Sequence, residues 1–506
     1  MGEDIYANTS RQQQRQPNLN IMAEEKELQV TSGELDASDA ASTELDKAAD
    51  DRLMRKCDLH IIPILFILYL FSFLDRVNIG NARIQGLEKS LHMKGNEYNV
   101  ALLVFFIPYV LLEVPSNLIL KRVAPSTWLS GIMFCWGICT MCQGFTKSYG
   151  GLVACRFLMG IFEAGFLPGV IYLLSMYYKR LEFQRRFAVF FASSLLAGAF
   201  GGLLAFAIAH MNGTDGYEGW RWIFIIEGIC TIALAMAAKF LIVDWPETAN
   251  FLSADDRVAL KRRINNDTGI ARMDRLDRTA LKLILSDWKI WAGGLMYLGV
   301  GTSGYATSFF IPTILREFGY SATASQVHTI PIYIVCTVVS LIAAYFTDRL
   351  HHRYAFTLFG VVFASIGYII LLAQGGLPVG VKYMAVFFVT SGIYITQPIT
   401  IGWLANNVGG HYKRAFSSAI QISLGNCSGF VGSLIFLTKE APRYPRGYGA
   451  ALAMLLFCGI VCTVTEILLI RENRKRDAGG RDYRYEYPKE RLDNIGDDHP
   501  DFRFVL

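Results

Sequence analysis

Twelve apolar segments, each long enough to cross a lipid bilayer as a helix, account for most of this chain of 506 residues. A spanning helix needs about 20 consecutive, mostly apolar residues, and its backbone groups are bonded within the segment. Only 18% of the residues are charged, against roughly 25% in average domains, and they gather in the tails and loops. The sequence therefore predicts an all-α membrane protein with twelve transmembrane helices. The predicted spans are 61–80, 97–119, 127–145, 152–178, 187–210, 221–242, 290–314, 325–346, 354–373, 381–403, 415–437 and 448–470.

A polar stretch between the sixth and seventh spans divides the membrane region into two halves. Many carriers are built from two such six-helix halves, with the substrate site between them. The expected organisation is a disordered cytoplasmic N-terminus 1–55, an N-terminal six-helix half 56–242, a cytoplasmic linker 243–289, a C-terminal six-helix half 290–471 and a cytoplasmic C-terminal tail 472–506.

Lysine and arginine are concentrated in the loops on one side of the predicted membrane, which the positive-inside rule makes the cytoplasmic side. An even number of spans then places both termini in the cytoplasm. The net charge of +5 reflects this asymmetry and does not indicate nucleic-acid binding. The basic residues of these loops are Lys121, Arg122, Lys179, Arg180, Arg185, Arg186, Arg349, Arg353, Lys413, Arg414, Arg471, Arg474, Lys475 and Arg476.

Two pairs of charged residues lie inside predicted spans, where a charge costs roughly 2.5–3.5 kcal/mol on insertion scales. Asp75 and Arg76 lie in the first span, and Arg156 and Glu163 lie two helical turns apart on one face of the fourth. The functional interpretation is that the acids exchange protons while the arginines grip a carboxylate through two parallel hydrogen bonds. The alternatives are that Asp75 and Arg76 reach the headgroups and that Arg156 pins two helices together.

Other polar residues in the spans are expected to play lesser parts. Gln397 and Tyr305 could line a cavity for a planar ring, although aromatic residues in spans are more often packing residues or interface anchors. Glu113 is expected near a cytoplasmic helix end as a snorkelling or loop-pairing residue. Glu227 is expected to form a structural pair with Arg221.

Seven motifs in order resemble the anion:cation symporter family of the major facilitator superfamily, and within it the fungal branch of allantoate, nicotinate and pantothenate permeases. The resemblance covers about Lys56 to Arg476 and is weakly specific for the substrate. The motifs are FLDRVNIGNA (73–82), EVPSNLILKRVAPSTWL (113–129), RFLMGIFEAGFLPG (156–169), GWRWIFIIEGI (219–229), DWPETANFLSADDR (244–257), NNVGGHYKRAFSSAI (406–420) and GNCSGFVGS (425–433).

The resemblance implies alternating access and proton-driven uptake of small organic anions. By position, Asp75 and Glu163 match the family's protonation sites, and Arg76 and Arg156 match the arginines that steer the anion. Asn426, in the family's glycine-asparagine pair, is implied as a substrate contact.

The loop after the second span departs from the pattern of the superfamily. The usual Gly-x-x-x-Asp-Arg gating loop is replaced there by PSNLILKR, which lacks the acid. A better remnant of that loop follows the eighth span, with Asp348 and Arg349 as the gating pair.

The sequence thus favours a carrier that symports a small organic anion with protons across the plasma membrane. Its expected partners are the anion, protons and the bilayer, without nucleic acid, cofactor or metal, and the chain is expected to be a monomer. Asn212, in an external Asn-Gly-Thr sequon, is a candidate glycosylation site. The alternatives are an exporter of an acidic metabolite and a nutrient sensor that does not transport. No arrangement of residues indicates an enzyme.

Overall fold

The computed structural model describes residues 48–120, 122–268, 278–350, 352–409, 411–488, 492 and 494–506. Of the N-terminus 1–55 that was predicted to be disordered, residues 1–47 lie outside this range. Residues 48–55 are helical, at the start of the span Ala48–Ile84, so the prediction is wrong for them. The chain comprises two units, Met1–Leu59 and His60–Leu506, and the second contains the site discussed below. Every regular element in the described ranges is a helix, which confirms the predicted all-α class.

The first half contains six spans, two of which consist of two helical pieces. The first span, Ala48–Ile84, combines a helix through residue 77 with α2 (Ile79–Ile84). The fourth consists of α6 (Tyr149–Glu163) and α7 (Phe166–Tyr177). The other helices are α3 (Leu87–Ser90), α4 (Glu97–Leu120), α5 (Pro125–Gly144), α8 (Arg180–Ala209) and α9 (Gly219–Leu241).

The linker and the second half are also built from helices, and one of the spans is again broken into two pieces. The linker contains α10 (Ala254–Thr268) and α11 (Arg278–Ser286). The eleventh span is broken like the fourth, into α16 (His411–Asn426) and α17 (Ser428–Leu434). The remaining spans are α12 (Trp288–Glu317), α13 (Ala322–Leu350), α14 (Arg353–Leu372), α15 (Val379–Asn406) and α18 (Pro445–Asp477).

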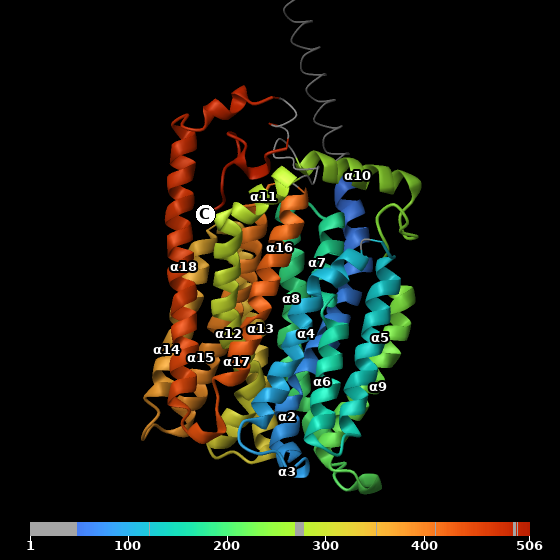
Figure 1. Cartoon of the computed structure of the whole chain (residues 1–506), viewed down its shortest axis with the longest axis vertical. Coiled ribbons are helices and arrows are strands. Elements are labelled where there is room, and N and C mark those ends of the chain that lie inside the picture. Colours follow the sequence, from blue (N-terminus) through green and yellow to red (C-terminus); the bar gives the residue numbers. More distant parts are fainter. Residues whose placement is uncertain are drawn as a thin grey trace, which may run out of the picture. The chain divides into compact units, whose positions relative to one another are not determined.

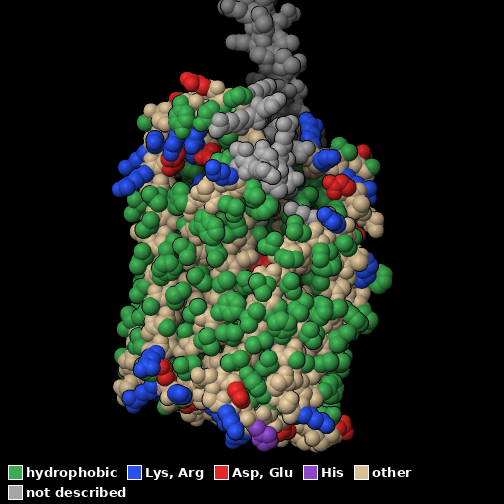
Figure 2. Space-filling view, viewed as in Figure 1, with side chains coloured by type: hydrophobic (Ala, Val, Ile, Leu, Met, Phe, Trp, Pro, Cys, Tyr) green, Lys and Arg blue, Asp and Glu red, His purple; other side chains and the backbone are tan. Residues whose placement is uncertain are grey.

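Nine segments in the described ranges are long and apolar enough to cross a membrane. The other three predicted spans coincide with α5, α12 and the pair α16–α17, whose small and polar residues dilute the apolar run. Figure 2 shows a broad belt of hydrophobic side chains, with charged side chains gathered at its two ends. This surface suits a bundle whose flank faces lipid, and it agrees with the predicted twelve-helix fold of two halves.

The two ends of the bundle differ, and we name each after its helices. The linker end has α10 and α11, and the α3 end has α2 and α3 (Figure 1). At the α3 end the halves are in direct contact, since the Asn99 amide donates to the carbonyls of Ser433 (2.6 Å) and Phe436 (3.2 Å). A Cβ at Gly80 would lie only 2.6 Å from the carbonyl oxygen of Phe309. Glycine at position 80 therefore allows this close approach of the first span and α12.

Glycine also brings α6 against α4 beside the buried charges. A Cβ at Gly160 would overlap the carbonyl oxygen of Phe105, and one at Gly165 would overlap the hydroxyl of Ser116. Small residues permit such close backbone packing in membranes. The break after Glu163 lies at this contact, so α4, α6 and α7 meet next to the site.

The end of the chain folds back onto the linker end of the second half (Figure 1). Arg476 Nη1 donates to three carbonyls of this segment, those of Asp497 (2.9 Å), His499 (3.1 Å) and Phe502 (2.8 Å). Val505 exchanges two hydrogen bonds with the Asn407 side chain, at 2.7 and 2.9 Å. We call residues 494–506 the tail segment. The elements that it contacts, including α15 and α18, belong to the second half.

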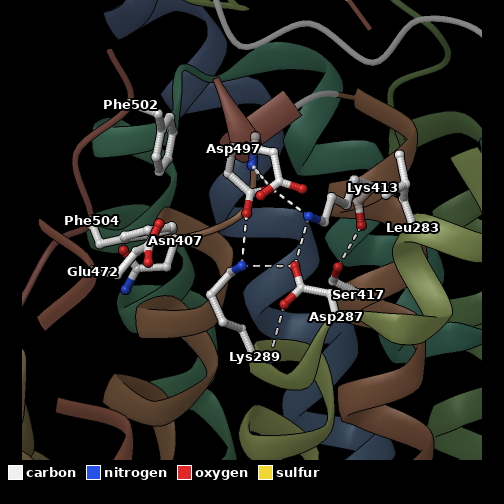
Figure 3. A network of polar contacts seen from close by, with 12 residues as sticks. Leu283, Asp287, Lys289, Asn407, Lys413, Ser417, Glu472, Asp497, Phe502 and Phe504 are labelled. Atoms are coloured by element: carbon white, nitrogen blue, oxygen red, sulfur yellow. Dashed lines mark hydrogen bonds and ion pairs between the residues drawn. The ribbon is translucent and has the colours of Figure 1, made fainter. Parts of the chain in front are cut away.

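A cluster of four buried charges anchors the tail segment (Figure 3). Asp497 accepts from Lys289 at 2.9 Å and from Lys413 at 2.8 Å. Asp287 pairs with the same two lysines, at 2.9 and 2.6 Å. We call these four residues the tail cluster. Two acids and two lysines balance in charge, so each side chain has partners of the opposite sign.

Candidate functional site

A buried ion pair lies at the centre of the first half. Arg76 of the first span is 2% exposed and Glu163 at the end of α6 is fully buried. Arg76 Nε donates to Glu163 Oε1 at 3.1 Å, and Arg76 Nη2 also contacts this oxygen. Ser72 Oγ donates to it at 2.7 Å. The first span therefore supplies the partners of Glu163 Oε1, although the sequence places Arg156 on the same helix as Glu163, and Oε2 has no hydrogen-bond partner among the described residues.

Hydrogen bonds continue from this ion pair into the second half. Arg76 Nη1 donates to the Tyr305 hydroxyl of α12 at 3.0 Å, and that hydroxyl donates to Asn426 Oδ1 of α16 at 2.9 Å. Asn426 Nδ2 then donates to Glu113 Oε2 of α4 at 3.3 Å. The path leaves the first half at Arg76 and returns to it at Glu113. We call these four residues, together with Glu163, the central chain.

Asp75 points away from its neighbour Arg76 because successive residues on a helix are about 100° apart. Its carboxylate is fully buried. Asp75 Oδ2 accepts from Trp136 Nε1 of α5 at 3.1 Å and from Thr231 Oγ1 of α9 at 2.8 Å. Asp75 therefore faces α5 and α9, while Arg76 faces α6 and α12. The headgroup alternative does not hold for this pair, since both side chains are buried.

Arg156 is a buried cation with few contacts. Its side chain is 1% exposed. Its Nη1 donates to the backbone carbonyl of Arg76 at 3.3 Å. Within the described part of the chain, its Nε and Nη2 have no hydrogen-bond partner and no acid forms an ion pair with it. A buried charge is costly unless it is paired and hydrogen-bonded, so the described residues leave the charge of this guanidinium largely uncompensated.

Two acids lie elsewhere than the sequence predicted. Glu227 is fully buried and contacts the Asn78 side chain, whereas Arg221 donates to the carbonyl of Gly144 at 3.1 Å and pairs with Glu218. The prediction that Glu227 pairs with Arg221 is therefore wrong. The backbone carbonyls at the end of α5 hold Arg221 instead.

Glu113 was expected at a helix end, and this prediction is also wrong. The side chain is fully buried and bonded to Asn426. Sequence reasoning missed its role because hydropathy gives depth along a span and not the direction of a side chain. A signal was present: Tyr109, Glu113 and Ser116 repeat at helical spacing and are all buried on one face of α4.

The other predicted site residues lie apart from the two arginines. Gln397 of α15 is 8% exposed and donates from Nε2 to the Tyr297 hydroxyl at 3.3 Å. Arg349 is exposed at the end of α13 and donates to Tyr345 of its own helix at 3.5 Å. The side chain of Asp348 lies outside the described set. Asn212 is exposed between α8 and α9, where its Oδ1 accepts from the Gly219 amide at 2.9 Å.

A cavity of about 250 Å³ separates the halves toward the linker end. Residues of α4 and α7 line it on one side, and residues of α15, α16 and the linker helix α11 line it on the other. Its walls are mostly apolar, with polar groups that include Asn117, Ser175 and Arg414. The direct contacts at the α3 end and the cavity at the other make the bundle asymmetric about the central chain.

Comparisons with known proteins agree on one family. The family model described as Major Facilitator Superfamily matches residues 65–433. An uncharacterised transporter of Schizosaccharomyces pombe is 35% identical over 86% of this chain and 87% of its own length. The high-affinity nicotinic acid transporter of Saccharomyces cerevisiae is 30% identical over 96% of this chain and 89% of its own.

Solved structures support the fold alone. A bacterial homologue of the human lysosomal transporter Spinster, in an inward-facing and occupied conformation, matches with a TM-score of 0.59 at 16% identity. The match covers 79% of this chain and 94% of that one. The family model and these relatives show that the chain belongs to the major facilitator superfamily of membrane transporters.

Proposed function

We propose that this protein is a secondary active transporter that carries a small organic anion together with protons. The observation that supports it most is Arg156, a buried guanidinium with two donor nitrogens that no described residue satisfies. A planar carboxylate fits such a fork with two parallel hydrogen bonds. The carboxylate of the anion would be the negatively charged partner that the described residues do not provide for Arg156.

Arg76 and Glu163 offer the means of coupling to protons. In the structure the guanidinium of Arg76 forms an ion pair with Glu163. An anion that bound Arg76 would compete with Glu163, and the displaced acid would be better accommodated with a proton, because an unpaired buried carboxylate is costly. Asp75, held by two neutral donors, is the second proposed protonation site.

The substrate we propose is a carboxylate such as nicotinate, pantothenate or allantoate. The similarity to a nicotinic acid transporter supports this class, as does the resemblance to the fungal branch of the anion:cation symporters. Tyr305 stacks on Phe309 with ring centroids 5.9 Å apart, directly beside Arg76. These aromatic residues, with Gln397 and Asn426, are proposed to contact the body of the substrate.

The proposed orientation puts the linker end in the cytoplasm and the protein in the plasma membrane. Basic loops between α4 and α5 and between α7 and α8 lie at the linker end, as the positive-inside rule requires. Asn212 then lies outside the cell, where it can be glycosylated, and Asp348 with Arg349 is proposed to form a cytoplasmic gate. The six-plus-six division at 243–289 and a monomeric state belong to the same proposal.

Uptake assays test this proposal directly. Cells that express the protein are given labelled nicotinate, pantothenate or allantoate at pH 5 and pH 8, with and without a protonophore. We expect greater uptake at pH 5, because the inward proton gradient would drive symport, and we expect the protonophore to abolish it. If net positive charge enters with the anion, each charge also gains about 2.3 kcal/mol per 100 mV of inside-negative potential. Uptake of one of these acids that ignores both pH and protonophore would refute proton coupling.

A further inference from the structure

We propose that Glu113 on α4 is a third proton-binding carboxyl, which exchanges its proton with the linker end of the molecule. This inference rests on the proposed proton-coupled transport and adds a role to Asp75 and Glu163. The argument draws on the contacts of Glu113, the position of the cavity and the half that supplies its partner.

Glu113 is a buried acid without a cation beside it. Its side chain is fully buried, and its hydrogen bond comes from the neutral amide of Asn426 at 3.3 Å. Among the residues that the structure describes, none forms an ion pair with it, and its Oε1 has no hydrogen-bond partner. Ionising such a group costs several kcal/mol unless water or a cation assists. The entry of water or the approach of a cation can therefore decide whether Glu113 holds a proton.

The groups that face Glu113 leave Arg76 as its main electrostatic partner. Arg76 of the first span is linked to it through Tyr305 and Asn426, and Arg76 is itself paired with Glu163 of α6. The neighbouring helix α17 contains no titratable residue. The remaining titratable side chains that face it are Tyr109 on α4, Tyr297 and Tyr305 on α12, and Cys427 next to α16.

The cavity toward the linker end reaches the level of this acid. Asn117 of α4 lines the cavity and lies one helical turn, about 6 Å, beyond Glu113 toward the linker end. Ile422 of α16 also lines it and lies one turn from Asn426 in the same direction. The Glu113–Asn426 pair thus lies at the inner end of the cavity. Water that entered the cavity would reach Glu113 first among the acids of the central chain.

The partner of Glu113 belongs to the opposite half, so its environment changes when the halves move. Glu113 is on α4 and Asn426 on α16, and their hydrogen bond crosses the interface. The Tyr305 hydroxyl in turn donates a hydrogen bond to Asn426 Oδ1 at 2.9 Å. Rocking of one half against the other, as in alternating access, would separate the amide from the acid. Protonation of Glu113 and the contact between the halves are therefore linked.

The test compares two modes of transport in Glu113→Gln, with labelled nicotinate, pantothenate or allantoate, whichever the wild type accumulates. Proteoliposomes report accumulation driven by a pH gradient, and preloaded proteoliposomes report exchange of labelled for unlabelled substrate at equal pH. Exchange needs anion binding and movement of the halves but no net proton transfer. We expect Glu113→Gln to lose driven accumulation and retain exchange, while Glu113→Asp retains some of both.

Glu466→Gln is the matched control, because Glu466 is a buried acid of a spanning helix, 8% exposed, that lies outside the central chain. It should behave as wild type in both modes. Driven accumulation by Glu113→Gln at the wild-type level would overturn the inference. If Glu113→Gln is reconstituted normally but loses exchange as well as driven accumulation, Glu113 would belong to anion binding, and the inference would also be overturned. A wild-type protein that does not respond to the pH gradient refutes the proposed function itself, before any variant is compared.

Discussion

The tail cluster and the central chain are two groups of buried charges in one molecule, and they are built in opposite ways. In the tail cluster, Asp497 and Asp287 share Lys289 and Lys413, with distances of 2.6–2.9 Å. Among the described residues, the central region has one ion pair, Arg76 with Glu163, and a second buried guanidinium, that of Arg156, without an acid to pair with. The first arrangement is electrically complete. The second leaves room for a charge brought from outside.

Whether the buried charges are fully paired helps to distinguish a structural group from a candidate functional one, and burial alone does not. Asp497 and Arg156 are equally inaccessible, at 0% and 1% exposure. Breaking a satisfied buried pair mainly affects stability, whereas removing the unsatisfied donors of Arg156 should mainly affect binding of the proposed anion. The four residues of the tail cluster belong to the start of α12, to α16 and to the tail segment, so the cluster does not join the two halves. We therefore expect changes in the two regions to have separate effects on uptake and on stability.

The largest expected effect on uptake comes from Arg156→Ala. The substitution removes two proposed charge-assisted hydrogen bonds of about 1.5–3 kcal/mol each, so uptake should fall by about 100-fold or more. Uptake of labelled substrate, normalised to surface protein, measures it. Arg156→Lys keeps the charge but loses the planar fork and should be intermediate. If Arg156→Ala transports normally, Arg156 pins helices and the contrast between the two regions disappears.

A smaller effect is expected for Tyr305→Phe, which keeps the ring but removes the hydroxyl between Arg76 and Asn426. A net hydrogen bond is worth about 0.5–1.5 kcal/mol, so uptake should fall by about tenfold or less. The initial rate at several substrate concentrations measures it. Tyr354→Phe is a useful comparison, because that hydroxyl is hydrogen-bonded to Thr463 at 3.1 Å, outside the central chain and the proposed substrate contacts. Equal losses in both variants would argue against a continuous path.

The smallest effect on uptake is expected for Asp497→Asn, although its effect on stability should be large. Lys289 and Lys413 would be left with Asp287 as their acid, and breaking a buried pair costs about 3–5 kcal/mol. Thermal unfolding of the purified protein should show a lower midpoint, while uptake per surface molecule stays near wild type. Asp501→Asn, in an exposed position of the same segment, is the control. Uptake lost in proportion to Arg156→Ala would give the tail segment a part in transport.

The stability supplied by Asp497 should also depend on pH. Burial disfavours its charged form, but Lys289 and Lys413 outweigh burial and hold the pKa of Asp497 well below its usual value. Because the unfolded value is about 3.9, the stabilisation is complete above that pH and is lost as pH falls below it toward the folded pKa. Hydrogen exchange of the tail amides should therefore accelerate below about pH 4. The Asp497→Asn variant should lack this component.

Much of the fold could be predicted from the sequence. All twelve apolar segments coincide with helices, because a run of about 20 apolar residues has no other low-energy form in a bilayer. Asp75, Arg76, Arg156 and Glu163 were identified from their charge within predicted spans, and all four are buried. Depth and polarity along a helix are local properties, so sequence reasoning reaches them.

The pairing of these charges was decided only by the tertiary structure. Glu163 is held by Arg76 of another helix, and Glu113, expected at a helix end, meets Asn426 across the two halves. Asp497, in a segment where the sequence marked no site, proved to be the partner of two lysines. Which side chains meet depends on the rotation of each helix about its axis and on glycines such as Gly160 that set how closely helices approach. Those are properties of helices packed together, and no single segment contains them.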